Sequence, residues 1–273
     1  VLVHANLLVA LTRPLVTHPF YWIQSIHTVQ EKPAWHWWAQ GLIGNLPDAT
    51  VAPSRAILQK LQAYGPVPRP IVIPNGILIS KFRDALPMSP VPWPAGAKVI
   101  GYVGRFDPVK RIPLLIEAMN HLPDDFHLAL VGYGNEEGRL RKLAASVRNG
   151  SGRIHFVGGT ASPERWYKTF DLFCLVSDAE GFALAALEAA ASGVQVLVCS
   201  TPALRETLPN VAWMPRDASA RQVATALLTC VNTPETRAKP ALDERFGVGM
   251  MVGRYGELIG NLLPGGRKHT NRM

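Results

Sequence analysis

The stretch DLFCLVSDAEGFALAALEAAASGVQVLVCS, residues 171–200, decides the fold. Two short apolar runs, DLFCLVS and VQVLVCS, flank a segment rich in alanine and leucine. The two runs lack the polar alternation of a half-exposed strand, which indicates strands that are covered on both faces. A strand, a helix and a second strand in this order predict a parallel sheet with right-handed crossovers.

The same alternation recurs before and after this stretch. Three further pairs of an apolar run and a helical run are KVIGYVGR with KRIPLLIEAMNHL (98–122), FHLALVGYG with NEEGRLRKLAASV (126–147), and RIHFVGG with PERWYKTF (153–170). The strand NVAWMPR and the helix ASARQVATALLTCV follow the opening stretch. The pattern predicts an α/β fold whose sheet is doubly wound.

The first 76 residues repeat the theme less clearly. Four runs are expected as strands: LVHA (2–5), FYWIQSIH (20–27), ATVAPS (49–54) and IVIPNG (71–76). Four prolines then fall within ALPMSPVPWPAG, where neither a helix nor a central strand is expected. We therefore expect a first domain over 1–80, a proline-rich linker over 81–97, a second domain over 98–245, and a glycine-weakened amphipathic helix over 246–263.

Composition narrows the class of protein. The 273 residues carry a net charge of +8, and the basic residues are scattered apart from the tail GGRKHTNRM. No basic helix with interleaved aromatics is present, which argues against a nucleic-acid partner. The first residues lack a charged leader, and no apolar run reaches the roughly 18 residues of a membrane span. Three distant cysteines without metal spacing predict buried thiols in a reducing compartment, the cytoplasm.

Two cations flank the loop that follows the strand at 98–105. Ligands of open parallel sheets bind at the carboxyl ends of strands. Arg105 follows Gly104 at such an end, and Lys110 is expected to open the next helix. A cation at a helix N-terminus is unfavourable unless an anion accompanies it. The pair therefore predicts a diphosphate site, although two surface cations at a loop would look the same.

Two glutamates stand eight residues apart in the opening stretch. Glu180 ends the loop after one strand, a helix is expected to begin at Gly181, and Glu188 lies within it. The free amides from Gly181 to Leu184 form an anion site. A carboxylate accepts two hydroxyl donors at once, as a vicinal diol requires. The spacing favours a ligand with a polyol at each end of a diphosphate, which describes a nucleotide-sugar.

Five motifs stand out along the chain: PNGI with Phe82 after it, GYVGRFDPVKR, LVGYGNEEGRL, HFVGG and EGFALAALEAAASGVQV. Together they resemble the retaining glycosyltransferases of family 4, which have the GT-B fold of two Rossmann-like domains. The resemblance covers most of residues 49–260. It implies transfer of a sugar from a UDP- or GDP-linked donor to an acceptor hydroxyl with retention of configuration.

The resemblance also implies a role for each candidate residue. Arg105 and Lys110 would neutralise the diphosphate without a metal, and Glu180 would bind hydroxyls of the donor sugar. Glu188 would bind the ribose, Thr160 would lie near the base, and His27 would face the reacting sugar. The other expected donor contacts are Gly104, Gly181, Phe182, Ala183 and Leu184. The helix from Phe246 would return to the first domain.

The sequence departs from the family pattern on the acceptor side. The family opens with a strand and a glycine-rich loop, whereas this chain begins near what resembles the fourth strand, VLVHA. CSTPALRE also replaces the usual double glycine before Glu206. We therefore expect a truncated first domain, whose missing strands would come from a longer chain or a partner.

Other readings remain open at this point. The chain could be a nucleotide-sugar-binding module with weak or no catalysis. The acceptor could be a glycan, a lipid-linked molecule or a small molecule. Trp35, Trp37 and Trp38, with Tyr21, Trp22 and the basic tail, could give a peripheral contact at the inner face of a membrane.

Overall fold

The structure is a computed structural model that describes residues 3–18, 20–27, 34–233, 242 and 244–263. It divides the chain into two compact units. Unit 1 consists of Val1–Gly76, Glu180–Phe182 and Asp243–Met273, and unit 2 of Ile77–Ala179 and Ala183–Leu242. The division falls at Gly76, so the proline-rich stretch that we expected as a linker is part of unit 2.

Unit 2 is built on a six-stranded sheet in which every pairing is parallel. The strand order is β6-β5-β4-β7-β8-β9, so the order reverses between β4 and β7 at the centre of the sheet. Such a reversal opens a crevice at the carboxyl ends of the strands. The strands are β4 (Lys98–Val103), β5 (Phe126–Val131), β6 (Ile154–Gly158), β7 (Leu172–Leu175), β8 (Gln195–Cys199) and β9 (Ala212–Met214).

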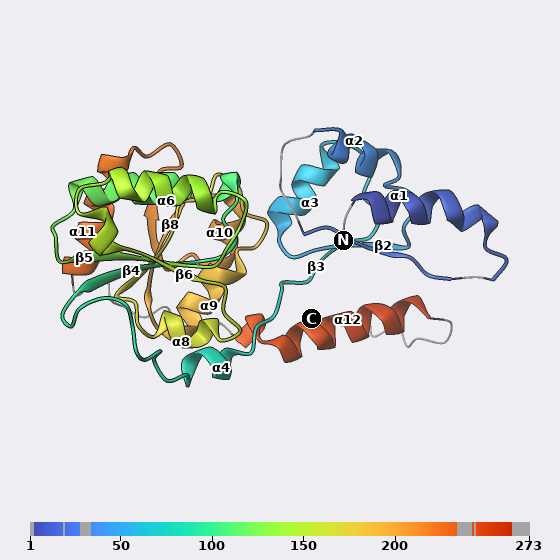
Figure 1. Cartoon of the computed structure of the whole chain (residues 1–273). Coiled ribbons are helices and arrows are strands. Elements are labelled where there is room, and N and C mark those ends of the chain that lie inside the picture. The colour runs from blue at the N-terminus through green and yellow to red at the C-terminus, as the bar shows by residue number, and fades with distance from the viewer. Residues whose placement is uncertain (1–2, 19, 28–33, 234–241, 243, 264–273) are drawn as a thin grey trace. The chain divides into compact units, whose positions relative to one another are not determined.

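Helices cover both faces of this sheet, as its continuously buried strands require (Figure 1). Every residue of β5, β7 and β8 is buried. The helices are α4 (Ile79–Arg83), α5 (Ile112–Ala118), α6 (Glu137–Ser146), α7 (Gly150–Arg153), α8 (Pro163–Tyr167), α9 (Leu184–Ser192), α10 (Pro202–Thr207) and α11 (Ala220–Asn232). The short helices η2 (Pro108–Lys110) and η3 (Met119–His121) adjoin α5. The predicted doubly wound α/β fold is confirmed.

Unit 1 contains a smaller parallel sheet in the order β1-β2-β3. On one face, Ala52 of β2 packs with Trp37 and with Ile57 and Leu61. On the other face, Ala49 and Val51 pack with Leu258. The elements are β1 (Ile23–Ser25), β2 (Ala49–Ala52), β3 (Pro70–Val72), α1 (Val3–Thr12), η1 (Arg13–Leu15), α2 (Trp35–Leu42), α3 (Arg55–Gln62), η5 (Glu244–Phe246) and α12 (Val248–Leu262).

One strand expected in the first domain is wrong. LVHA was expected as a strand, but α1 begins at Val3 and runs to Thr12. Asn6 of α1 is buried, and its Nδ2 donates to Gln40 Oε1 at 3.1 Å. The same Gln40 oxygen accepts a bond from Gln24, whose own Oε1 accepts from Thr50 Oγ1 at 3.3 Å. This buried polar chain ties α1 to α2 and the sheet, and it outweighs the local β preference of an apolar run.

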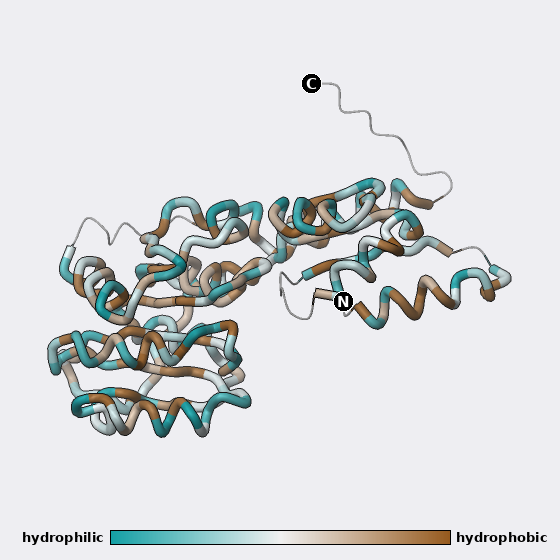
Figure 2. The backbone as a smooth tube through the Cα atoms, turned by 90° about the horizontal axis from the view of Figure 1, so that it is seen from above, coloured by the Kyte–Doolittle hydropathy of each residue, from teal (hydrophilic) through white to brown (hydrophobic). Residues whose placement is uncertain are grey.

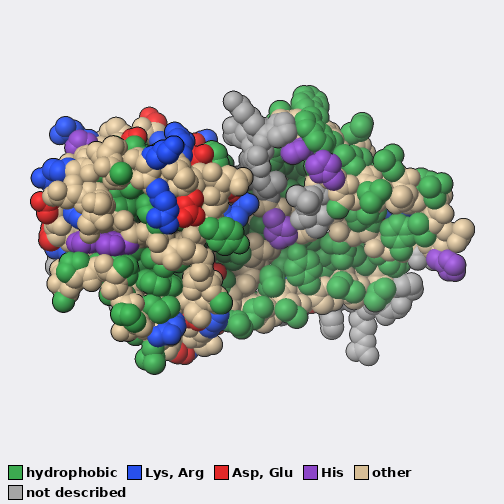
Figure 3. Space-filling view, viewed as in Figure 1, with side chains coloured by type: hydrophobic (Ala, Val, Ile, Leu, Met, Phe, Trp, Pro, Cys, Tyr) green, Lys and Arg blue, Asp and Glu red, His purple; other side chains and the backbone are tan. Residues whose placement is uncertain are grey.

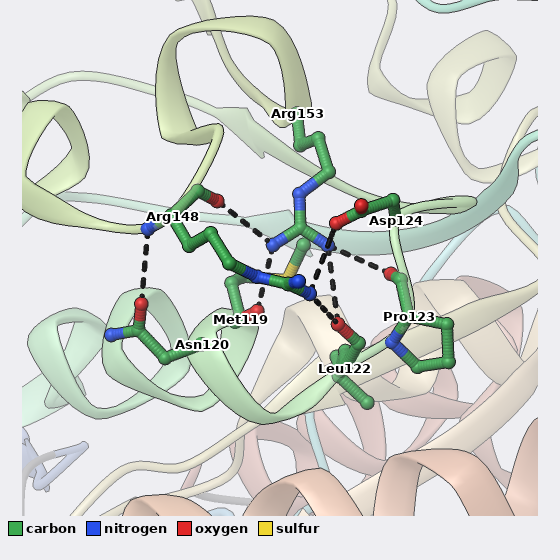
Figure 4. Close-up of polar contacts among 7 residues, drawn as sticks. All are labelled: Met119, Asn120, Leu122, Pro123, Asp124, Arg148 and Arg153. Carbon is green, nitrogen blue, oxygen red and sulfur yellow. Dashed lines mark hydrogen bonds and ion pairs between the residues drawn. The ribbon is translucent and has the colours of Figure 1, made fainter.

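Unit 2 contains a different buried polar element, at the amino-terminal edge of β5 and β6 (Figure 4). The Arg153 side chain is buried, and its guanidinium donates to the carbonyls of Met119, Leu122 and Pro123 at 2.7–3.3 Å. Asp124 lies 3.6 Å from the same guanidinium. Desolvation lowers the pKa of Arg153 below its ordinary value, and Asp124 opposes that shift. The guanidinium thus adds charged donors to the carbonyls at the end of η3 and just after it.

The two units differ in surface composition. On the face shown in Figure 3, hydrophobic side chains dominate over unit 1, whereas charged side chains gather on unit 2. Neither α1 nor α2 contains Asp, Glu, Lys or Arg, and most of α1 is brown in Figure 2. Leu11 is 74% exposed and Trp38 is 66% exposed. Within the described part of the chain, no helix is both long and apolar enough to cross a membrane.

The three cysteines are buried in unit 2. Cys174, Cys199 and Cys230 are buried and are not joined in disulfide bonds, as expected. Burial raises the pKa of the Cys199 thiol to about 11, which keeps it protonated at neutral pH. The basic tail lies outside the described residues.

Candidate functional site

Three glycines join the carboxyl ends of β4, β5 and β6. Gly104 donates its backbone N–H to the Val131 carbonyl at 3.0 Å, and Gly132 donates to the Gly158 carbonyl at 2.8 Å. Gly132 has φ +141°, and a Cβ there would lie 1.9 Å from the Gly104 carbonyl oxygen. A side chain is therefore excluded at this position. The result is a strand-end platform in which backbone, rather than side chains, faces the crevice.

The loop after β4 holds Arg105 at this platform. Tyr102 is fully buried, and its hydroxyl donates to the Arg105 carbonyl at 2.8 Å. Phe106 donates its N–H to the Tyr133 carbonyl and accepts from Glu136, which ties the loops after β4 and β5 together. The Arg105 guanidinium lies 2.9 Å from Asp107, and its side chain is 78% exposed. The backbone is thus fixed while the charged head remains open to solvent.

Lys110 lies in the next turn, but it does not open a helix as expected. It ends η2, and α5 begins two residues later at Ile112. Arg111 separates the two elements with φ +51°, a left-handed conformation that interrupts the helix. The macrodipole argument for an anion at Lys110 therefore fails, and the case for a phosphate contact rests on its place in the strand-end loop.

Arg111 is a residue that sequence reasoning missed. Its guanidinium lies 3.2 Å from Asp178, in the loop after β7, and also donates to the Arg216 carbonyl after β9. The Asp178 N–H donates to the Val109 carbonyl at 2.9 Å. Arg111 thereby joins three strand-end loops. Only its position next to Lys110 could have indicated it, and nothing in the sequence separates the two cations.

The helix after β7 begins later than expected. Gly181 was expected to open it, but α9 begins at Leu184. Ala183 precedes it with φ +51° and provides no side-chain cap. The amides nearest the helix start therefore belong to Leu184 and the residues after it, in place of the Gly181–Leu184 run. Ser177, at the end of β7, is buried, and its Oγ makes no hydrogen bond within the described part of the chain.

Glu188 lies one turn inside α9 and faces a tyrosine. The Tyr167 hydroxyl donates to Glu188 Oε2 at 2.8 Å, and Tyr167 is fully buried. Burial raises the pKa of Glu188, while the Tyr167 hydrogen bond and the charge of Lys81 lower it. Among the described residues, no donor reaches Glu188 Oε1. One carboxylate oxygen is thus fixed, and the other is available to a ligand.

His27, Glu180, Gly181 and Phe182 belong to unit 1. Gly181 accepts a hydrogen bond from Ser54 Oγ at 3.2 Å, and a Cβ on Gly181 would lie 2.3 Å from the His27 carbonyl oxygen. His27 Nε2 lies 2.8 Å from Ser25 Oγ. Partial desolvation lowers the pKa of His27, which favours the neutral imidazole at neutral pH. The structure thus brings His27 close to Gly181, which follows the buried Glu180.

Thr160 follows β6 and makes a local bond. Its Oγ1 accepts from the Ser162 N–H at 3.0 Å, which forms a turn just before α8. Gly158 precedes it with φ +86°. Because β6 is an edge strand of the sheet, the turn lies at one end of the strand-end platform. Among the described residues, no group of three or more His, Cys, Asp or Glu is arranged to hold a metal ion.

Comparison with known proteins identifies this arrangement. The family described as "Glycosyl transferases group 1" matches residues 88–241, more than half of the chain. The chain belongs to the glycosyl transferases group 1 family. The match includes all six strands of the unit 2 sheet, and with them the glycine platform, Arg105, Lys110 and Glu188.

Curated relatives of this group 1 chain are distant. The D-inositol 3-phosphate glycosyltransferase of Xylanimonas cellulosilytica is 27% identical over 176 residues, which are 58% of this chain and 42% of the relative. A GDP-mannose-dependent alpha-mannosyltransferase of Mycolicibacterium smegmatis is 30% identical over 173 residues, 62% of this chain and 43% of the relative. The match thus spans less than half the length of these curated relatives.

Solved structures share the fold over nearly the whole group 1 chain. The Anabaena protein HepE, in complex with UDP and glucose, has a TM-score of 0.82 at 21% identity and covers 95% of this chain and 76% of its own. A sucrose-phosphate synthase from Thermosynechococcus elongatus has a TM-score of 0.81 at 21% identity and covers 96% and 72%. At these identities the likeness establishes the fold alone, which is that of GT-B glycosyltransferases.

Proposed function

We propose that this chain transfers a sugar from a nucleotide-sugar donor to an acceptor hydroxyl with retention of configuration, as glycosyltransferases of family 4 do. The observation that carries the proposal is the strand-end platform of unit 2. It lies at the point where the strand order reverses, and Arg105 and Lys110 follow its first strand. Membership of the glycosyl transferases group 1 family over residues 88–241 supports a nucleotide-sugar as the ligand of this platform.

The diphosphate binds over the glycine platform in this proposal. The backbone at Gly104 and Gly132 lets phosphate oxygens approach closely because no side chain stands in the way. Arg105 offers an exposed guanidinium, and Lys110 a second cation in the same loop. These charges stabilise the nucleoside diphosphate as it leaves, which is the role a metal plays in other transferases. No metal cofactor is required.

Glu188 binds the ribose, and Tyr167 orients it. The Tyr167 bond holds Oε2, so Oε1 points to one hydroxyl of a ribose diol. The ionised form is needed to accept that hydroxyl, and the Tyr167 bond together with Lys81 favours it against the effect of burial. Arg111 and Asp178 position the loops around the donor without contacting it. The turn at Thr160 lies on the side where the base binds.

The sugar end of the donor depends on Glu180, Phe182, Ala183, Leu184 and His27. Glu180 accepts hydroxyls of the donor sugar, and the amides at the start of α9 contact phosphate and sugar. His27 presents a neutral imidazole to the reacting sugar. The bond from sugar C1 to the phosphate oxygen breaks, and a bond from C1 to the acceptor oxygen forms on the same face of the ring, while the proton of the acceptor hydroxyl passes to the departing diphosphate.

The donor is UDP- or GDP-linked. HepE was solved with UDP, and the mannosyltransferase relative is named as GDP-mannose-dependent. Glycans, lipid-linked molecules and small molecules are the acceptor classes to test. The proposed location is the cytoplasm, with a peripheral contact at a membrane through the exposed apolar side chains of α1 and α2. A nucleic acid is not a proposed partner.

A nucleotide-sugar-binding module without efficient transfer is the second candidate. It is favoured by one observation: the family match lies almost wholly in unit 2, while the acceptor side would lie in unit 1. Both candidates require donor binding, and they differ in turnover.

One experiment tests both. The chain is incubated with UDP-, GDP- and ADP-sugars, and thermal shifts identify the donor that binds. The same donor is then supplied with candidate acceptors, and the released nucleoside diphosphate and the glycosylated product are measured. Binding with product formation supports the transferase, binding without product supports the module, and no thermal shift with any donor contradicts both.

A further inference from the structure

A groove in unit 1 lies between the edge strand β3 and the helix α12. It encloses about 560 Å³, within the range of small-molecule sites, and all of its lining residues belong to unit 1. The donor residues of unit 2 play no part in it. The groove is lined by Arg69, Ile71, Val72, Ile73, Arg254, Glu257, Leu258, Asn261 and Leu262.

Two arginines, Arg69 and Arg254, line this groove. Neither guanidinium makes a hydrogen bond or an ion pair with another residue in the part of the chain that the structure describes, although the Arg69 backbone carbonyl accepts the Thr50 N–H at 3.3 Å. Elsewhere in the protein, cations such as Arg141 and Arg139 are paired with nearby carboxylates. Arg69 also adopts a left-handed backbone with φ +46°, a conformation uncommon outside glycine. Two open guanidiniums in one groove favour an anion, which a phosphate matches in geometry.

The floor of the groove is apolar. Ile73 and Leu258 form part of the buried cluster on this face of the sheet, and Ile71 and Leu262 pack against that cluster while remaining partly exposed. An inorganic anion would leave this apolar surface in water. A ligand with an alkyl chain next to its phosphate would bury it.

Two polar groups complete the lining. Glu257 and Asn261 are exposed and lie one turn apart on α12, on the same side as Arg254. The groove therefore carries two positive charges and one negative charge. A carboxylate and an amide oxygen accept hydroxyl donors, so the headgroup that fits is a phosphodiester that also bears hydroxyls.

We propose that the β3–α12 groove binds a phospholipid with a hydroxylated, anionic headgroup. Arg69 and Arg254 hold the phosphate, Glu257 and Asn261 accept the headgroup hydroxyls, and the start of the acyl chains lies along Ile71 and Leu262. The site is separate from the donor site, and it would fix unit 1 to a lipid even when no nucleotide-sugar is bound.

Soluble short-chain lipids test the proposal on the full chain. Calorimetry compares dihexanoyl-phosphatidylglycerol with dihexanoyl-phosphatidylcholine, both below their micelle concentrations, and with glycerol 3-phosphate. Saturable binding of the phosphatidylglycerol, at least tenfold tighter than the other two, is expected. Equal binding of the two lipids would overturn the role of the arginines, and equal binding of glycerol 3-phosphate would overturn the role of the apolar floor.

Variants locate the site. Arg69→Gln with Arg254→Gln should reduce the affinity for phosphatidylglycerol at least tenfold, and Leu262→Ser should weaken it while leaving the charge unchanged. Arg221→Gln, at an exposed position on α11, is the control for net charge. Hydrogen exchange should slow in β3 and α12 when the lipid binds. Unaltered affinity in the double arginine variant, or protection confined to other elements, would refute the proposal, and donor binding by unit 2 is expected to stay unchanged in every variant.

Discussion

Unit 2 and unit 1 use the same architecture, a parallel sheet between helices, but they stabilise it differently. In unit 2, three of the six strands are buried throughout, and side chains such as Arg153 and Arg111 bind the loops at both ends of the sheet. In unit 1, three short strands support helices α1 and α2, which carry no charged residue and expose leucine and tryptophan. A surface helix normally has a charged outer face.

The difference indicates that unit 2 fixes its strand-end platform through its own contacts. The strand ends of unit 2 are fixed by backbone bonds among glycines and by ion pairs between loops. A diphosphate would therefore meet a preformed platform, which lowers the cost of binding. The polar chain from Asn6 to Thr50 gives unit 1 a specific core, yet its apolar helices leave much of their surface to solvent.

The largest effect is expected at the glycine platform. Gly132→Ala should lower the free energy of unfolding by about 3–5 kcal/mol, because its Cβ would lie 1.9 Å from the Gly104 carbonyl oxygen and φ is +141°. Gly138→Ala is the control, since nothing lies within 4 Å of a Cβ in the first turn of α6. Chemical denaturation measures both. Similar stabilities in the two variants would show that the platform is not rigid.

The next largest effect is expected at Arg153, at the amino-terminal ends of β5 and β6. Arg153→Met should cost about 2–4 kcal/mol, because the carbonyls of Met119, Leu122 and Pro123 would each lose a charged donor at a buried position. Arg148→Met is the matched control: its side chain is exposed and pairs with the same Asp124 at 3.0 Å, so a loss below about 1 kcal/mol is expected. If both variants lose the same stability, burial is not what makes Arg153 important.

A smaller, pH-dependent effect is expected at two stacked histidines. His127 Nδ1 lies 2.9 Å from His155 Nε2, on neighbouring strands of unit 2. Burial is the main cause that lowers the pKa of each ring; Arg153 adds to the shift at His127, where Asp125 opposes it, and His127 adds to it at His155. The unfolded chain therefore takes up protons first as pH falls below about 6.5. Stability should be full above that pH and decline below it.

His155→Gln should flatten this decline. The variant retains a polar group on β6 but removes one titrating ring, so its free energy of unfolding should fall less than that of the parent chain between pH 7 and pH 5. Urea titrations at a series of pH values give the two slopes. A variant slope equal to or steeper than the parent's would show that the pair does not titrate as described.

The smallest effect is expected in unit 1, on α12. Gly253→Ala should stabilise the protein by about 0.5–1 kcal/mol, since a Cβ there meets nothing within 4 Å and alanine favours the helix. Gly41→Ala is the contrast, because its Cβ would lie 2.1 Å from the Tyr64 carbonyl oxygen where α2 meets α3. Thermal unfolding should shift upward for the first variant and downward for the second. Melting temperatures that shift in the same direction in both variants would contradict the claim that Gly253 has room for a side chain and Gly41 does not.

The sequence predicted unit 2 better than unit 1 for a physical reason. A strand buried on both faces must be apolar throughout, so a run such as FHLALV can be predicted as a strand from its composition. LVHA met the same criterion but lies in α1, because a short apolar run cannot distinguish a strand from a helix whose partners are distant in sequence.

Other errors concern single residues. Ala183 and Arg111 adopt left-handed backbone conformations, which the residue pattern does not predict. As a result, α9 and α5 begin a few residues later than we expected. The Tyr167–Glu188 bond joins residues 21 positions apart, so spacing alone could not reveal it. The Arg153 network likewise depends on contacts across about 30 residues of chain.

The central claim is that the platform of unit 2 binds a nucleoside diphosphate through Lys110. Calorimetric titration of UDP and of GDP into the full chain, into Lys110→Ala and into the control Lys142→Ala, on the exposed side of α6, tests it most directly. We predict saturable binding of one of the two nucleotides to the parent chain and to the control. In Lys110→Ala the loss should be about 2–4 kcal/mol, the scale of one well-placed electrostatic group. Binding of that nucleotide with unchanged affinity in Lys110→Ala, or no binding of either nucleotide to the parent chain, would contradict the account.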